Sequence, residues 1–150
     1  MCIRESIIFD QATISVGYSS IDAELNENYF YRGTLRVAAG QDLPLTPDVK
    51  YNINLDYEVN ENSFGQINYT FTDEMFNSDV FLGTREIQDS YSIVNASWTL
   101  VRGNKQLQFY VNNLTDETAE LGRNYEDYVD LITVNRPRSI GIKFSWLLDK

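Results

Sequence analysis

The sequence has 150 residues, of which 43% are hydrophobic and 13% aromatic, and its formal net charge is -10. This length allows one domain of ordinary size, and the hydrophobic fraction is too high for a disordered chain. The acidic balance excludes a nucleic-acid surface as a partner, because phosphate binding needs clustered Lys and Arg.

The residue inventory excludes further kinds of site. The sequence has no His and one cysteine, Cys2, so neither an internal disulfide nor a Cys/His zinc site can form. The commonest general base is absent as well. Asp116 and Glu117 are adjacent carboxylates, but neighbours in a strand point to opposite faces and do not share one site. We therefore expect no enzyme activity, no catalytic residue, no metal and no cofactor.

Residues 1–10 have no clear assignment, although Ile7, Ile8 and Phe9 are compatible with the end of an earlier strand. From Ala12 onward, apolar and polar residues alternate in segment after segment. Side chains on a strand point alternately to two faces, so this pattern predicts strands with one apolar and one polar face. The segments expected to form strands are residues 12–23, 51–59, 66–72, 89–101, 106–116 and 137–146.

The connections between these segments are alternately short and long. Short turns are expected at residues 60–63 and 102–105, and long loops at residues 24–43, 75–88 and 117–135. No helical period competes, and the solid apolar runs and crossovers of a parallel sheet are missing. The sequence therefore predicts an all-β fold, an antiparallel up-and-down meander of about six long strands.

The apolar face of this meander can meet either a soluble core or lipid. The expected strands, at about 10 to 13 residues, are longer than the five or six residues typical of soluble sheets. Turns and loops alternate as they do across an outer membrane, and the second face is uniformly polar, as a lumen requires. Tyr57, Tyr91 and Trp146 are expected in interfacial aromatic girdles. These features favour a segment of a transmembrane β-barrel, with a soluble antiparallel β-sandwich binding module as the alternative.

Four short pieces resemble the C-terminal part of the β-barrel of TonB-dependent outer-membrane receptors. They are LPLTP at 43–47, SIVNA at 92–96, VNNLTDE at 111–117 and RPRSIG at 136–141. The NLTDE and PRSIG pieces are the most specific. The likeness implies a partial receptor barrel over residues 11–146, between the unclear segment 1–10 and a polar tail at 147–150.

The resemblance implies a bacterial outer-membrane barrel of about 22 strands with an N-terminal plug. Such receptors bind a scarce ligand outside the cell and import it; the usual ligands are an iron-siderophore, cobalamin, haem or a sugar. The implied partners are outer-membrane lipid, the remainder of the barrel and plug, a TonB-type energy-coupling protein that acts through the plug, and a small-molecule ligand.

The sequence departs from the family pattern because it has no plug, no TonB box and no signal peptide: Arg4 and Glu5 stand where an apolar leader would begin. It is therefore expected to be a fragment of a longer precursor, a truncated reading frame or a chain that pairs with others. Six or seven strands are fewer than the eight or so of the smallest single-chain barrels. An open edge in lipid would also leave backbone groups unpaired.

In the receptor barrels that the sequence resembles, the long loops face the exterior and carry the ligand contacts. Residues 29–32, YFYR, form a compact aromatic and cationic cluster. Aromatic and Arg side chains dominate binding hot spots; the alternative is that such side chains pack the loops together. The candidate ligand-binding residues are Tyr29, Tyr31, Arg32, Arg85, Arg123, Tyr125 and Tyr128.

Overall fold

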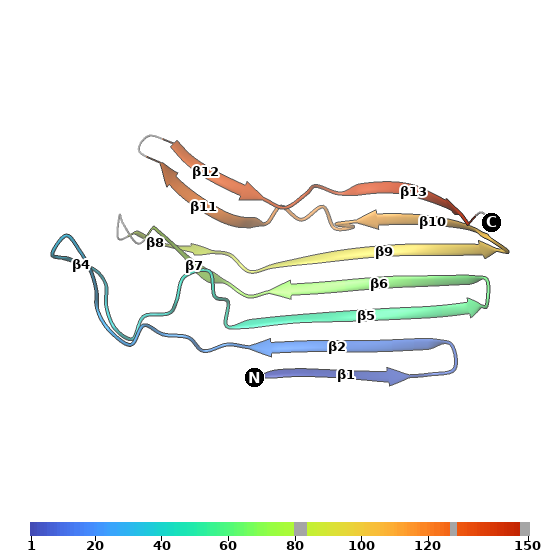
Figure 1. Cartoon of the computed structure of the whole chain (residues 1–150), viewed down its shortest axis with the longest axis horizontal. Coiled ribbons are helices and arrows are strands. Elements are labelled where there is room, and N and C mark those ends of the chain that lie inside the picture. Colours follow the sequence, from blue (N-terminus) through green and yellow to red (C-terminus); the bar gives the residue numbers. More distant parts are fainter. Residues whose placement is uncertain (80–83, 127–128, 148–150) are drawn as a thin grey trace.

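In the computed structural model, the chain forms one antiparallel sheet of seven strands, with a small hairpin in each of three long connections (Figure 1). The structure describes residues 1–79, 84–126 and 129–147, without the side chains of 77–79, 84, 85, 124–126, 129 and 130. None of the described residues forms a helix able to cross a membrane. The strands of the sheet, in their spatial order, are β1 (Cys2–Ile8), β2 (Ala12–Ser20), β5 (Val49–Asn60), β6 (Ser63–Thr72), β9 (Tyr91–Arg102), β10 (Lys105–Asn112) and β13 (Ser139–Trp146).

The predicted all-β antiparallel meander is confirmed, with differences at the ends of its strands. The segment without a clear assignment contains β1, which pairs with β2 along its whole length. The strand expected to reach residue 116 ends at Asn112 instead. Asn113 and Asp116 have positive φ angles of 53° and 57°, a conformation that leaves the extended ladder. Only β5, β6 and β9 reach ten or more residues, so the other strands are shorter than predicted.

The connections are sorted between the two ends of the sheet (Figure 1), as the alternation of short and long connections predicted. Tight turns at residues 9–11, 61–62 and 103–104 lie at one end. At the other end each long connection folds back on itself, which the sequence analysis missed because these strands are short and have no clear period. The three hairpins are β3 (Tyr29–Tyr31) with β4 (Thr34–Val37), β7 (Met75–Asp79) with β8 (Thr84–Gln88), and β11 (Glu120–Glu126) with β12 (Val129–Val134).

One face of the sheet is apolar across all seven strands. Directly paired residues of antiparallel strands share a face, so the register defines rows of side chains that cross the sheet. One row, in spatial order, is Ile7, Ile14, Leu55, Ile67, Ala96, Val111 and Ile140. The side chains in these rows stand on the surface; Ile140, for example, is 80% exposed.

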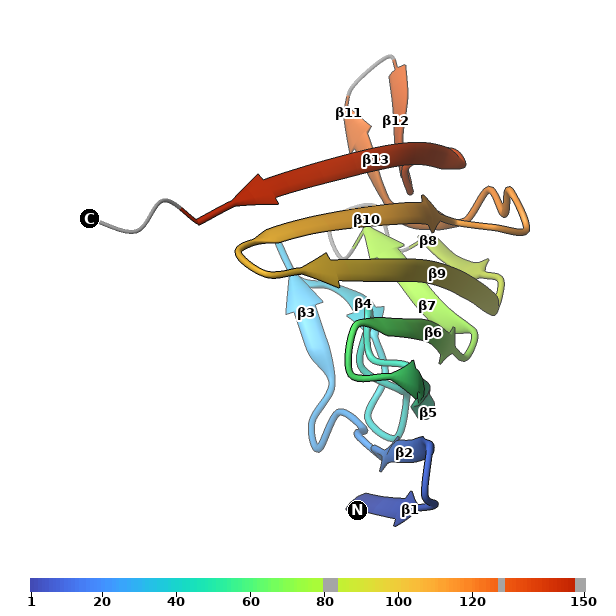
Figure 2. The ribbon, with the colours of Figure 1, turned by 90° about the vertical axis from the view of Figure 1, so that its right-hand side faces the viewer.

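Nothing in the described part of the chain covers this apolar face. In the view turned by 90°, the strands of the sheet lie one above another from β1 to β13 in a single twisted layer (Figure 2). Among the described residues, Val37 and Ala119 are the buried hydrophobic ones, and both lie in the long connections rather than beneath the sheet. A sandwich would bury one face of each sheet against the other. The soluble-sandwich alternative is therefore wrong.

Aromatic residues gather near both ends of the apolar face. Towards the hairpin end, the rings of Tyr51 and Phe71 stack with 4.9 Å between their centroids. Tyr91, expected in a girdle, lies on the opposite, polar face, because it pairs with Thr72 one position out of step with the apolar rows. The aromatic residues of the apolar face towards the tight-turn end are Tyr57, Trp98, Phe109, Phe144 and Trp146.

The polar face carries a ladder of asparagine side chains. Asn68 Nδ2 donates a hydrogen bond to Asn54 Oδ1 at 2.7 Å, and Asn95 Nδ2 donates to Asn68 Oδ1 at 3.3 Å. Asn95 Oδ1 in turn accepts from the backbone N–H of Asn113 at 3.0 Å. The ladder runs across β5, β6 and β9 to the end of β10. It pairs polar groups within the wall of the sheet and keeps that face hydrophilic.

Asn113 joins the end of β10 to the segment before β13. Its side chain is buried; Nδ2 donates to the carbonyl oxygens of Glu117 at 2.8 Å and Arg136 at 3.0 Å, and Oδ1 accepts from the N–H of Glu117 at 2.9 Å. Beside it, Asp116 accepts from the backbone N–H of Arg138 at 2.9 Å. These contacts join the NLTDE and PRSIG pieces, so the two pieces that resemble the receptor family most closely form one structural unit.

We predict that Asn113→Ala lowers the free energy of unfolding by roughly 1 to 3 kcal/mol, because it removes the side-chain partner of the Glu117 N–H and of the Arg136 carbonyl in a partly buried site. Urea unfolding in detergent micelles, followed by tryptophan fluorescence, measures the change. The matched control is Asn112→Ala: this neighbour is exposed and makes one bond, of 3.3 Å, to Ser139 Oγ. Similar losses in the two variants would contradict the role assigned to Asn113.

Candidate functional site: the hairpins at one end of the sheet

Three of the predicted ligand-binding residues meet at the tip of the β3–β4 hairpin. Tyr29 and Tyr31 lie on β3, and Arg32 follows in the turn with a φ of 51°. The guanidinium carbon of Arg32 lies 5.3 Å from the centre of the Tyr31 ring, within the range of a cation–π contact. Tyr29 and its neighbour Phe30 are exposed. The tip therefore offers aromatic surface and a cation to the solvent.

Backbone hydrogen bonds hold the base of this hairpin. The N–H of Leu25 donates to the carbonyl of Gln41 at 2.9 Å, and the N–H of Leu43 donates to that of Ala23 at 2.8 Å. Closer to the tip, Val37 is buried. The long connection between β2 and β5 is therefore a structured arm, and its aromatic tip has a defined position.

Arg123 joins two other hairpins through their carboxylates. It lies on β11, where its Nε and Nη2 donate to Glu120 at 3.0 and 2.9 Å and its Nη1 pairs with Glu86 on β8. The side chain of Arg123 is only 24% exposed. In this arrangement Arg123 packs the loops together, which is the alternative to direct ligand contact.

The remaining candidates belong to the same pair of hairpins. Arg85 lies on β8 and pairs with Ser78, and Tyr125 lies on β11 and pairs with Asp130. The side chains of Arg85 and Tyr125, and the whole of Tyr128, fall outside the described residues. In the part of the chain that the structure describes, β11 contacts both β7 and β8, whereas β3 and β4 contact neither hairpin. The candidates therefore divide into two groups.

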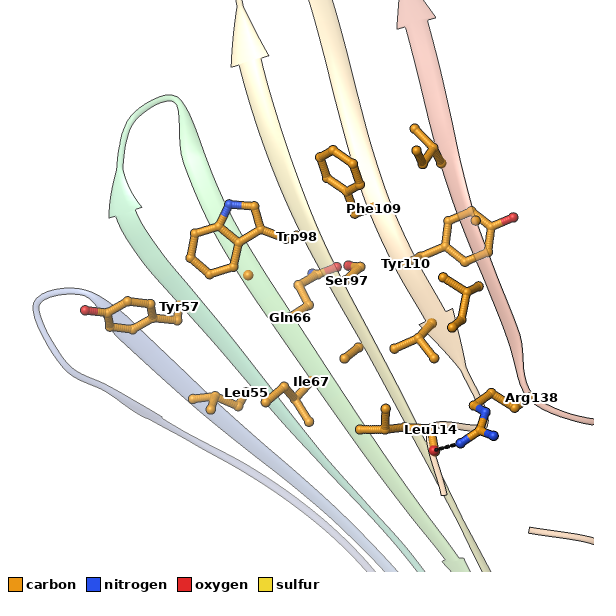
Figure 3. Close-up of a pocket in the computed structure, with 16 residues that line it drawn as sticks. Leu55, Tyr57, Gln66, Ile67, Ser97, Trp98, Phe109, Tyr110, Leu114 and Arg138 are labelled. Carbon is orange, nitrogen blue, oxygen red and sulfur yellow. Dashed lines mark hydrogen bonds between the residues drawn. The ribbon is translucent and has the colours of Figure 1, made fainter. Parts of the chain in front are cut away.

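A shallow groove of about 1130 Å³ lies on the apolar face of the sheet (Figure 3). Ile67, Trp98, Phe109 and other apolar-face residues line it, and Arg138 closes one end with a hydrogen bond to the carbonyl of Leu114 at 3.4 Å. Because the groove lies on the apolar face, it is a poor site for a polar ligand.

A metal site is a separate question. Among the described residues no group of three or more carboxylate, Cys or His side chains is placed to hold a metal ion.

No protein-family model and no curated protein sequence matches this chain. Solved structures of receptors do match it. The siderophore receptor PiuA from Acinetobacter baumannii is similar over 91% of this chain, with a TM-score of 0.73 and 23% identity. The ferric yersiniabactin uptake receptor FyuA from Yersinia pestis is similar over 92%, with a TM-score of 0.70 and 12% identity. The ferric-catecholate import receptor Fiu from E. coli is similar over 91%, with a TM-score of 0.66 and 19% identity.

The chain spans only about a fifth of these receptors: 19% of PiuA and Fiu and 21% of FyuA. At such identities the comparison establishes the fold. This chain has the fold of a segment of an outer-membrane receptor barrel. The resemblance to TonB-dependent receptors found in the sequence is therefore confirmed for the fold.

We predict that Arg123→Gln loosens the β11–β12 hairpin, because it removes both carboxylate pairs and leaves Glu86 and Glu120 to repel each other. Backbone amides of β11 should exchange with deuterium about threefold to tenfold faster, as expected for partly exposed ion pairs. Arg32→Gln makes the same change of charge in the separate β3–β4 hairpin and should leave β11 unaffected. Unchanged exchange of the β11 amides in Arg123→Gln would contradict the joining role of Arg123.

Proposed function

We propose that this chain forms part of the barrel of a bacterial outer-membrane receptor that imports a ferric chelate. The observation that carries the proposal is the uncovered apolar face, seven strands wide, in a sheet whose long hairpins all lie at one end. In an outer-membrane barrel such a face meets lipid and the long loops face the exterior. The 12 residues of β5 span about 40 Å, and a tilt of about 40° reduces their height to about 30 Å, the thickness of the hydrocarbon core.

Import belongs to the complete receptor, of which this chain would supply about a fifth. The remainder of the barrel would pair with the outer edges of β1 and β13. The polar face, with its asparagine ladder, would line the interior around the plug, and a TonB-type energy-coupling protein would act through that plug. Each of these partners follows from the receptor fold rather than from a contact in this chain.

An iron-siderophore is the ligand class favoured over cobalamin, haem or a sugar, because the three receptors above are described as taking up siderophores or ferric complexes. Ferric complexes of catecholates and hydroxycarboxylates are anionic. The β3–β4 tip supplies a cation at Arg32 and aromatic rings at Tyr29 and Tyr31 for such a ligand. Arg85, Tyr125 and Tyr128 would contribute from the other two hairpins, which Arg123 joins through Glu86 and Glu120.

Fractionation of the source cells tests the location. An antibody raised against residues 21–48 should label intact cells and should detect its target in the outer-membrane fraction. Recovery of the target in the soluble fraction would overturn the receptor proposal.

We predict that Arg32→Ala weakens binding of a ferric tris-catecholate about tenfold in the detergent-solubilised receptor, a loss typical of a hot-spot residue. Quenching of intrinsic fluorescence by the ferric complex gives the dissociation constant. Arg4→Ala is the matched control, because it removes a cation on β1, away from the hairpins (Figure 1). Equal affinities of the Arg32→Ala variant and the unmodified protein would remove the β3–β4 tip from the ligand site.

A further inference from the structure

A basic and aromatic cluster lies at the tight-turn end of the sheet, far along the strands from the hairpins. In the register, Arg102 of β9 pairs with Lys105 of β10, and Lys105 pairs with Trp146 of β13. The three side chains therefore belong to the apolar face. The Nζ atom of Lys105 lies 5.1 Å from the centre of the Trp146 ring, a cation–π contact.

The backbone under this cluster is held in place. The N–H of Leu147 donates to the carbonyl of Asn104 at 2.9 Å, and Asn104 Nδ2 donates to the carbonyl of Leu147 at 2.7 Å. Gly103 has a φ of 58° and Asn104, the second central residue, has no positive φ, which is the pattern of a type II′ hairpin turn. The β9–β10 turn and the end of β13 are therefore one unit, which keeps Trp146 beside Lys105.

Neither cation is neutralised within the part of the chain that the structure describes. The ion pairs formed there involve Arg123 and Arg138, and both Arg102 and Lys105 are exposed. Glu61, in the adjoining β5–β6 turn, is the acidic residue that the register brings closest to Arg102. Two cations that have no ion-pair partner among the described residues stand out at one edge of a chain with a net charge of -10.

Exposed apolar side chains continue directly from the cations towards the middle of the sheet. Leu100 and Phe144 form the next row and Trp98 the one after it, with 41%, 60% and 40% exposure. A ligand that fits this edge has an anionic group beside the cations and a hydrocarbon chain along the sheet. Tryptophan favours the level of lipid headgroups, and Lys and Arg near a membrane surface attract anionic lipids.

We propose that Arg102, Lys105 and Trp146 bind the phosphate of an anionic phospholipid in the leaflet at the tight-turn end of the barrel. Arg102 and Lys105 donate hydrogen bonds to the phosphate oxygens, and Trp146 lies against the glycerol region. The proposal rests on the apolar face meeting lipid, as in the proposed function. Such a site would give a strongly acidic protein a local attraction to an anionic leaflet.

The test uses the full 150-residue chain in vesicles that contain brominated phosphatidylglycerol or brominated phosphatidylcholine at equal mole fraction. Trp98→Phe leaves Trp146 as the one tryptophan. Quenching should give an association constant about thirtyfold higher for the anionic lipid, as expected for two cations near a headgroup. Adding Arg102→Gln with Lys105→Gln should remove this preference, and adding Arg102→Lys with Lys105→Arg should keep it. Equal quenching by the two lipids would overturn the site.

Three further measurements separate a lipid site from general charge attraction, from a chain outside the membrane and from a site for free phosphate. Lys50→Gln with Lys143→Gln removes the same charge from the polar face and should keep the preference; its loss there would show general attraction rather than a site. Trp146→Phe leaves Trp98 as a reporter of lipid contact, and absence of its quenching by either lipid would overturn the membrane location and the site together. Inorganic phosphate should not displace the lipid at constant ionic strength; displacement would identify the ligand as free phosphate.

Discussion

The uncovered apolar face of the seven-stranded sheet is the constraint on which the rest of the structure depends. In water each Å² of such surface is unfavourable by roughly 25 cal/mol, and the described chain has no second layer to bury it. In the proposed barrel this face meets hydrocarbon, where every backbone polar group must be paired. The ladders from β2 to β10 meet that demand on both sides of each strand. The asparagine ladder and the Asn113 contacts keep the opposite face hydrophilic.

The outer edges of β1 and β13 show what the sheet needs from elsewhere. Each strand runs antiparallel to its neighbour, so the first and the seventh run in the same direction. A direct pairing of these two edges would be parallel, whereas an outer-membrane barrel is antiparallel with an even number of strands. An odd number of further strands is therefore required to close it. The similar receptors are long enough to supply further strands, because this chain spans only about a fifth of them.

The alternation of apolar and polar residues explains which features of the fold could be predicted from the sequence and which could not. It located six of the seven strands of the sheet and left β1 unassigned, because a period of two follows directly from strand geometry. It misplaced the end of β10, since it carries no information about the positive φ of Asn113. It also assigned Tyr91 to a girdle, although pairing with Thr72 puts that ring on the polar face. The link from Arg123 to Glu86 spans 37 positions of sequence, and no local pattern connects residues so far apart.

By itself, the sequence determined the class of the fold, the two-faced character of the sheet, and the sorting of short and long connections, because all three depend on neighbouring residues. Only the tertiary structure decided that the long connections are hairpins and that Arg123 serves their packing. It alone also showed that Arg102, Lys105 and Trp146 meet at one edge. These features arise from pairing between distant strands, where register and turn geometry, rather than local composition, decide which side chains become neighbours.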